Sequence, residues 1–386
     1  MDDATPAAAP SQRYRAGIER GDWQDDPAQH AALHALDRLH AALLQPAPRQ
    51  GLFDRLRGRK TPAAPDGLYL WGGVGRGKTF LVDLFYAGLP LTEIRGEALA
   101  GGRPADGPPG KRRTHFHRFM RRVHALLRTH SGERDPLATI ARDWRARLRV
   151  LVLDEFFVSD IGDAMILARL LERMFAEGIV LVTTSNVDPP DLYKDGLQRA
   201  RFLPAIELIR RHCQVVHLDS PTDYRLRALT RSPVYRAPLD AESDAWLDSR
   251  WRELGGDDAH REAGIEIDGR RIPVRARCQD MAWFDFDALC EGPRGATDYI
   301  EIAREFHTVL LGGIPVLDAT RDDAARRFVT LVDELYDRHV NLVCTADAAP
   351  HALYAGERLG AAFERTASRL VEMQGADYLA SGHLGA

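Results

Sequence analysis

The feature that most constrains this chain is a glycine-rich segment, Gly72-Gly73-Val74-Gly75-Arg76-Gly77-Lys78-Thr79. It matches the pattern GxxxxGK(S/T) and lies between a short apolar run, residues 68–71, and a helix-like stretch, residues 78–86. Glycines let the backbone wrap so that successive N–H groups point at phosphate oxygens, with the positive end of the helix dipole behind them. We therefore predict a nucleoside triphosphate site, in which Lys78 reaches the β- and γ-phosphates and the Thr79 hydroxyl binds Mg²⁺. The predicted cofactor-binding residues here are Gly72, Gly73, Val74, Gly75, Arg76, Gly77, Lys78, Thr79 and Phe80.

A pair of acids follows the apolar run Val150-Leu151-Val152-Leu153, which is typical of a buried strand. Asp154 then lies at the carboxyl end of that strand, where it can hold the hydration shell of the magnesium ion. Glu155 is predicted to polarise a water for in-line attack on the γ-phosphate. A small-molecule kinase must exclude that water, so the pair favours hydrolysis over phosphate transfer to an acceptor.

The next apolar strand ends in Thr183-Thr184-Ser185-Asn186. An amide at this edge can hydrogen-bond both the γ-phosphate and the attacking water, so we assign Asn186 to the catalytic set. Ser-Asn after a strand is also an ordinary turn sequence, because both residues favour turns. Its position one strand beyond Asp154 and Glu155 favours the functional interpretation.

Strands that are apolar on both faces alternate with helices along the first two thirds of the chain, which predicts a parallel sheet covered on each side. The expected strands are 68–71, 114–116, 150–153, 179–184 and 215–218, with a long helical region over 190–211. We predict an α/β nucleotide-binding core over residues 67–228. Residues 1–45 are predicted as a mobile or peripherally docked arm followed by a helix, 46–66 as a linker, and 229–386 as an α/β-helical lid or accessory domain.

The composition excludes several classes of protein. A formal charge of -4 over 386 residues argues against a dedicated nucleic-acid coat protein, and no apolar run is long enough to span a membrane. The four cysteines lack CxxC spacing, which predicts free thiols in a reducing cytoplasm. The basic stretch 111–128 is read either as a surface for an acidic partner or as a solvated helix face, and we favour the solvated face. We do not favour His115 and His117 as metal ligands, because no Cys or carboxylate lies at a matching spacing.

A weaker internal echo occurs near the C-terminus. Residues 314–317, 325–336 and 340–344 repeat the strand-helix-strand order of residues 150–184, and the segment 346–354 loosely matches 185–193. A single sequence leaves both a decayed duplication and a chance similarity open.

The motifs together resemble an AAA+ ATPase, and more narrowly the ZapE cell-division ATPases of Gram-negative bacteria and their mitochondrial Afg-one-like relatives. The resemblance covers about residues 67–380. It is carried most specifically by DEFFVSDIGDAM (154–165) and GLQRARFLPAI (196–206), together with 67–79, 223–227 and 363–373.

The resemblance implies the fold of a P-loop AAA+ ATPase that uses ATP and Mg²⁺ in a ring-like homo-oligomer, for which a hexamer is one form. It also implies a cytoplasmic protein recruited to the division site at the inner membrane, where it binds FtsZ and lowers the stability of FtsZ polymers. A nucleic-acid ATPase and a mitochondrial-type protein-quality-control ATPase are the alternatives. Protein threading is not expected, because residues 115–120 lack the glycine of an aromatic pore loop.

The same resemblance implies arginines that act on the nucleotide. A neighbouring subunit's arginine commonly stabilises charge on the γ-phosphate, and we favour Arg201 over Arg199 for that role. Arg225 and Arg369 are the alternatives for a sensor arginine of the same chain. For each of the four, a salt-bridging surface arginine remains an open reading.

Overall fold

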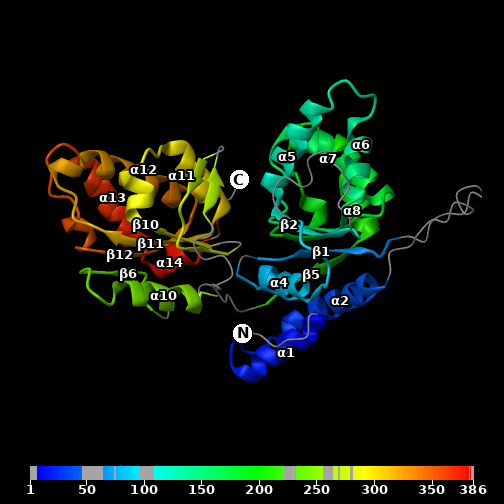
Figure 1. The fold of residues 1–386 in the computed structure, drawn as a ribbon, viewed down its shortest axis with the longest axis horizontal. Coiled ribbons are helices and arrows are strands. Elements are labelled where there is room, and N and C mark those ends of the chain that lie inside the picture. The colour runs from blue at the N-terminus through cyan, green and yellow to red at the C-terminus, as the bar shows by residue number, and fades with distance from the viewer. Residues whose placement is uncertain are drawn as a thin grey trace, which may run out of the picture. The chain divides into compact units, whose positions relative to one another are not determined.

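The chain folds into two compact units, unit 1 (Met1–Thr222) and unit 2 (Asp223–Ala386). The computed structural model describes residues 7–45, 64–73, 75–94, 108–220, 229, 232–254, 264–267, 270–278, 281–381 and 383. Each unit contains a sheet of its own with helices on both faces (Figure 1). The predicted linker, 46–66, lies mostly outside the described residues.

Unit 1 is built around a parallel sheet of five strands in the order β2-β3-β4-β1-β5. The strands are β1 (Gly67–Trp71), β2 (Gly110–His115), β3 (Leu148–Asp154), β4 (Val180–Ser185) and β5 (Cys213–His217). The central strands β1, β3 and β4 are buried along nearly their whole length, as expected for a sheet covered on both faces. The predicted α/β architecture with a parallel sheet is thus confirmed.

Helices cover the two faces of this sheet in separate groups (Figure 1). Val150 and Val152 of β3 pack with the group α1, α2 and α4, whereas Leu151 and Leu153 pack with the other group. This alternation is the period of two that a strand imposes on its side chains. The helices are α1 (Pro10–Arg20), α2 (Pro27–Leu44) and α4 (Lys78–Gly88) on one face, and α5 (Phe116–Thr129), α6 (Pro136–Arg145), α7 (Ile161–Ala176) and α8 (Leu203–His212) on the other.

The arm that the sequence predicts as mobile or peripherally docked is docked, and its residues 10–20 form a helix, α1, that was not predicted. Tyr14 is 2% exposed, and the Trp23 ring lies so close to Gly17 that no side chain fits there. Only a few apolar side chains make these contacts, so the segment shows no clear hydrophobic period. Pro10 at the start of the helix and Gly21 just after its end are the sequence signals that mark it.

Two further expectations for unit 1 were wrong. Strand β2 begins at Gly110, not at residue 114, because its basic side chains are satisfied inside the protein. The region 190–211 is not one helix: it holds two short 3-10 turns, η1 (Pro189–Asp191) and η2 (Arg199–Arg201), before α8. Positive φ angles at Tyr193, Asp195 and Gln198 interrupt it, since a right-handed helix excludes that conformation.

Unit 2 contains a second five-stranded sheet in the order β6-β12-β11-β10-β9, parallel except for the β9–β10 pair. The expected strand at 314–317 is wrong, since β11 ends at Ile314. The strands are β6 (Tyr235–Arg236), β9 (Ala276–Arg277), β10 (Met281–Asp285), β11 (Thr308–Ile314) and β12 (Asn341–Ala346), with a separate hairpin of β7 (Ile265–Ile267) and β8 (Arg270–Ile272).

The helices of unit 2 also divide between two faces (Figure 1). Leu247 and Trp251 of α10 (Ser243–Glu253) pack against one face, where they meet Leu310 and Val343. The other face packs against α11 (Ala296–Glu305), α12 (Asp322–Asp337) and α13 (Gly360–Glu372); the remaining short elements are η3 (Asp287–Glu291), η4 (Ala319–Arg321), η5 (Pro350–Ala352) and α14 (Ala376–Leu379).

Candidate nucleotide-binding site

The glycine-rich segment joins β1 to α4, which is the strand-loop-helix context that the pattern requires. Gly72 has φ +154°, and a Cβ there would lie 2.3 Å from the carbonyl oxygen of Leu218. Gly77 has φ +90°, and a Cβ there would lie 2.6 Å from the Gln29 amide nitrogen. Both positions therefore require glycine, so the loop conformation follows directly from the sequence. Val74 lies outside the described residues.

Lys78 is the first residue of α4, and its side chain folds back over the loop. Its Nζ donates to the carbonyl oxygens of Gly72 at 2.8 Å and Gly73 at 2.6 Å. The residue is 8% exposed. The cation is therefore held directly above the loop, where it can meet phosphate oxygens.

The N-terminal segment supports this loop. Gln29 of α2 donates to the carbonyl oxygen of Arg76 at 3.3 Å. Phe80, predicted to contact the cofactor, instead directs its ring toward the N-terminal segment, where its centroid lies 4.8 Å from that of Trp23. We infer that a nucleotide contact by Phe80 would involve its backbone.

Asp154 is held by a buried arginine that sequence reasoning did not assign to the site. Arg113 of β2 donates to Asp154 from Nε at 2.6 Å and from Nη2 at 3.1 Å, and the two side chains are 5% and 4% exposed. Arg113 Nη1 also donates to Asp83 of α4. Burial alone would lower the pKa of Arg113, but the two carboxylates outweigh it and raise that pKa above its usual value. The Arg113 guanidinium therefore ties α4 to the end of β3.

This tie also locates Thr79 relative to Asp154. Thr79 precedes Asp83 by four residues on α4, so the two share one face of the helix. That face meets Arg113 and hence Asp154. The described residues contain no cluster of three metal-ligating side chains. One hydroxyl and one carboxylate nevertheless suit Mg²⁺, which keeps several waters and binds proteins through one or two carboxylates plus phosphates.

Glu155 has a strained backbone, with φ +53°. Its N–H donates to the Thr184 hydroxyl at 3.1 Å, which fixes this turn to the end of β4. About a third of the Glu155 side chain is exposed, and one carboxylate oxygen lies 4.0 Å from His115 Nδ1. The carboxylate is therefore open to water while its backbone is fixed.

Asn186 lies at the same edge of the sheet. It follows Ser185, which pairs with Trp71 and accepts a hydrogen bond from the Gly72 N–H at 3.2 Å. Asn186 is exposed. The glycine-rich loop follows β1, Glu155 follows β3 and Asn186 follows β4. All three therefore lie along one edge of the sheet, as expected for neighbouring parallel strands.

The four arginines have different environments. Arg199 donates to the Pro190 carbonyl oxygen, whereas Arg201 is exposed. Arg225 lies outside the described residues. Arg369 belongs to α13 of unit 2, where its guanidinium pairs with Asp333 and Asp337. These carboxylates supply the salt-bridging role that the sequence left open for Arg369.

The basic stretch 111–128 does not form one continuous solvated surface. Lys111 Nζ donates to the carbonyl oxygens of Tyr86 and Leu89, and Arg113 is buried as described above. Burial lowers the pKa of Lys111. The first basic residues of this stretch are thus part of the folded interior. None of the helices in the described parts of the chain combines the length and apolarity needed to cross a bilayer.

Three supporting residues, Arg113, Gln29 and Thr184, were missed because their roles depend on contacts between distant segments. Arg113 meets a partner 41 residues away, and Gln29 meets the loop from 47 residues away. The signal in the sequence was a charged residue two positions before the end of a strand, which is unusual for a covered sheet.

Comparison with known proteins identifies the family. The model of the AFG1-like ATPase family matches residues 8–100 and 103–382. The chain is 43% identical over 390 residues to "Cell division protein ZapE" of Escherichia coli K12, with 98% of this chain and 99% of that protein covered. It is 32% identical over 454 residues to "Lactation elevated protein 1 homolog B" of Danio rerio, with 96% and 87% covered.

Solved structures resemble the chain only distantly. The crystal structure of DnaI has a TM-score of 0.32 and 17% identity, and the match covers 52% of this chain and 87% of DnaI. That score is too low to support an argument. The phosphate loop, the acid pair and the family match over residues 8–100 and 103–382 agree with one another: the chain belongs to the AFG1-like ATPase family.

Proposed function

We propose that this protein is a Mg²⁺-dependent ATPase that acts in cell division, where it lowers the stability of FtsZ polymers while hydrolysing ATP to ADP and phosphate. The observation that carries the hydrolytic part is the position of Glu155. Its carboxylate is open to water at the sheet edge, and its backbone is fixed to Thr184. A water activated there attacks the γ-phosphorus, so that the bond to the β-phosphate oxygen breaks and Glu155 accepts the proton of the water.

The residues of the loop bind and orient the triphosphate. Lys78 and the backbone N–H groups of Gly72–Thr79 meet the phosphates, and Thr79 with Asp154 would hold Mg²⁺. The ion, when bound, neutralises charge that develops on the phosphate oxygens. Arg113 keeps the Asp154 carboxylate in one orientation through two hydrogen bonds.

A neighbouring subunit completes the site in this proposal. Arg201 is exposed in the described unit, so its guanidinium is available to a second copy of the chain. Such a trans arginine raises hydrolysis rates by roughly 10³- to 10⁵-fold in related hydrolases. The protein is therefore expected to hydrolyse ATP as a homo-oligomer.

The role in cell division rests on the likeness to the Escherichia coli protein, whose name gives that role. The decisive experiment measures ATP hydrolysis with and without FtsZ while FtsZ polymer is sedimented from the same reaction. We expect FtsZ to stimulate hydrolysis and ATP to reduce the sedimented polymer. The Lys78→Ala variant should show neither FtsZ-stimulated hydrolysis nor an ATP-dependent loss of sedimented polymer.

Single-stranded DNA serves as the competing partner in the same assay. Unchanged hydrolysis and polymer with FtsZ, together with stimulation by DNA that falls steeply with salt, would replace this proposal with a nucleic-acid ATPase.

A further inference from the structure

Unit 2 repeats the arrangement of strands found in unit 1. Four parallel strands in the order β10-β11-β12-β6 correspond to β2-β3-β4-β1, and they occur in the same order along the chain. Along the chain, β1 is followed by α4 and β6 is followed by α10, and each of these helices packs on one face of its sheet. The later helices of each unit cover the other face. The hairpin β7–β8 and the strand β9 are additions to unit 2.

The strand pairings define matching positions. Leu153 of β3 pairs with Thr183, and Leu311 of β11 pairs with Cys344. On the neighbouring strands, Tyr69 pairs with Thr183 and Tyr235 pairs with Cys344. The registers of three adjacent strands therefore agree between the two units.

A tyrosine bond recurs at matching positions. The Tyr69 hydroxyl donates to the Val187 carbonyl oxygen at 2.8 Å, and the Tyr235 hydroxyl donates to that of Ala348 at 2.7 Å. Each acceptor lies two residues after the end of the adjacent strand. Strand order alone would not produce the same side-chain contact twice.

The turn that presents Glu155 also recurs. Glu155 has φ +53° and donates its N–H to Thr184 Oγ1 at 3.1 Å. Gly313 has φ +74° and donates its N–H to Thr345 Oγ1 at 3.0 Å. In both units a threonine on the neighbouring strand thus fixes a left-handed residue at the end of the central strand.

The segments that follow the fourth strand agree as well. The 3-10 turns η1 and η5 begin with Pro189 and Pro350, as the sequence echo between 185–193 and 346–354 suggested. Beyond them, Tyr193 contacts Phe202 and Tyr354 contacts Phe363, with ring centroids 5.5 and 5.1 Å apart. The echo therefore reflects a repeated fold.

The chemistry of unit 1 is absent at the matching positions of unit 2. Gly312 and Gly313 replace Asp154 and Glu155, and aspartate replaces Asn186. The connection between β6 and α10, residues 237–242, has no glycine and no lysine, and it contains two acids. This connection cannot wrap around an anion as the glycine-rich loop does.

One of these acids, Asp240, lies three residues before the first residue of α10. Asp240 accepts hydrogen bonds from the Glu242 N–H and the Ser243 hydroxyl, each at 3.0 Å. Its other carboxylate oxygen accepts from Arg236 at 2.7 Å. An anion and a cation therefore pair just before the start of α10, the helix that corresponds to α4 and whose amino-terminal end would face a phosphate in a nucleotide-binding unit.

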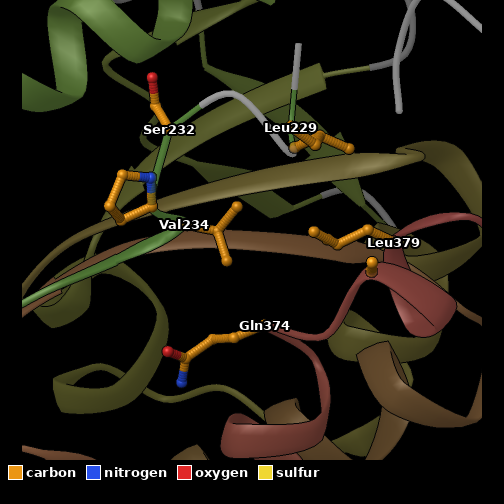
Figure 2. A pocket seen from close by; sticks show the side chains of 7 residues that line it. Leu229, Ser232, Val234, Gln374 and Leu379 are labelled. Carbon is orange, nitrogen blue, oxygen red and sulfur yellow. The ribbon is translucent and has the colours of Figure 1, made fainter. Parts of the chain in front are cut away.

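We propose that unit 2 is a second, nucleotide-free copy of the nucleotide-binding fold, in which the Asp240 carboxylate occupies the phosphate position. A cavity of about 390 Å³ in the described part of unit 2 lies elsewhere: it is lined by Leu229, Ser232, Pro233, Val234, Gln374, Ala376 and Leu379, none of which belongs to the connection that matches the glycine-rich loop (Figure 2).

The first test counts nucleotide sites on the full-length protein by titration with a non-hydrolysable ATP analogue. We expect one site per chain in the wild type and none in Lys78→Ala. Hydrogen exchange locates the site: the analogue should protect residues 78–88 and leave 243–253 unchanged. Analogue-dependent protection of 243–253 would overturn the proposal, whereas loss of protection at 78–88 alone would count against the phosphate site of unit 1.

The second test empties the position that Asp240 fills. In Asp240→Ala, inorganic phosphate should bind between Arg236 and the end of α10 and slow exchange of residues 243–253. The slowing is about tenfold at a phosphate concentration ten times the dissociation constant. Asp240→Asn is the matched control, because it retains an acceptor oxygen in the same place and should not respond.

Chloride at equal ionic strength controls for screening in the second test. Equal responses of the alanine and asparagine variants, or no response in either, would show that Asp240 does not stand in a phosphate position. If Asp240→Ala does not fold, Asp240→Ser replaces it, because a hydroxyl can still accept from the Glu242 N–H but leaves the anion position open.

Discussion

Replacement of Arg113 by leucine tests whether the buried guanidinium holds Asp154 in place. Arg113 and Asp154 are 5% and 4% exposed and share two hydrogen bonds, so removal of the arginine leaves a carboxylate buried without its partner. Breaking such a pair costs about 3–5 kcal/mol of unfolding free energy. For a unit of this size we expect the melting temperature of unit 1 to fall by roughly 6–20 °C.

The double variant Arg113→Leu/Asp154→Leu separates pairing from packing. Apolar residues of similar volume often replace a buried ion pair without loss, so the double variant should recover most of the stability. Arg20→Leu is the matched control in the same unit, since the Arg20–Asp22 pair is 48% and 42% exposed. That change should cost less than about 1 kcal/mol.

Chemical denaturation followed by circular dichroism measures these differences. An Arg113→Leu variant as stable as Arg20→Leu, or a double variant less stable than Arg113→Leu alone, would refute the reasoning. Either result would mean that Asp154 does not depend on Arg113 for its charge balance.

Three further predictions concern the loop, the thiols and the oligomer. Gly72→Ala should weaken ATP binding by roughly tenfold or more, because strain of about 1–3 kcal/mol accompanies the contact with Leu218. Calorimetric titration measures the affinity, and the control Gly132→Ala, where a Cβ meets nothing within 4 Å, should bind ATP normally. Burial raises the pKa of the thiols of Cys213, Cys290 and Cys344, so these thiols carry little thiolate at pH 8. Mass spectrometry should therefore detect rapid alkylation at Cys278 alone, and equal labelling of all four thiols would contradict their burial. Mixing Arg201→Ala with Glu155→Gln should restore hydrolysis that neither variant has alone, because each supplies the group that the other lacks; unchanged inactivity would exclude Arg201 as the trans arginine.

The phosphate loop and the acid pair could be predicted from sequence because their chemistry is local. Glycines, a lysine and two acids occupy fixed places relative to apolar strands, and parallel strands end at one edge of the sheet. The supporting contacts could not be predicted in the same way. Arg113 was read as part of a basic stretch, since its burial depends on Asp154 of the neighbouring strand and Asp83 of a helix.

Unit 2 illustrates a second limit. Its strands β6 and β9 have two residues each, too few to show the alternation of a strand. The sequence retained a few positions of the repeated fold, namely tyrosines, a threonine, a proline and a phenylalanine. The bond from Tyr235 to Ala348 and the turn at Gly313 become visible only when the strands are paired.

The central claim is that a triphosphate bound at Gly72–Thr79 is hydrolysed by a water that Glu155 activates. Single-turnover hydrolysis of radiolabelled ATP by Glu155→Gln, with nucleotide affinity measured on the same sample, tests it most directly. The account predicts unchanged affinity and a rate lower by roughly 10²- to 10⁴-fold. Hydrolysis at the wild-type rate would contradict it.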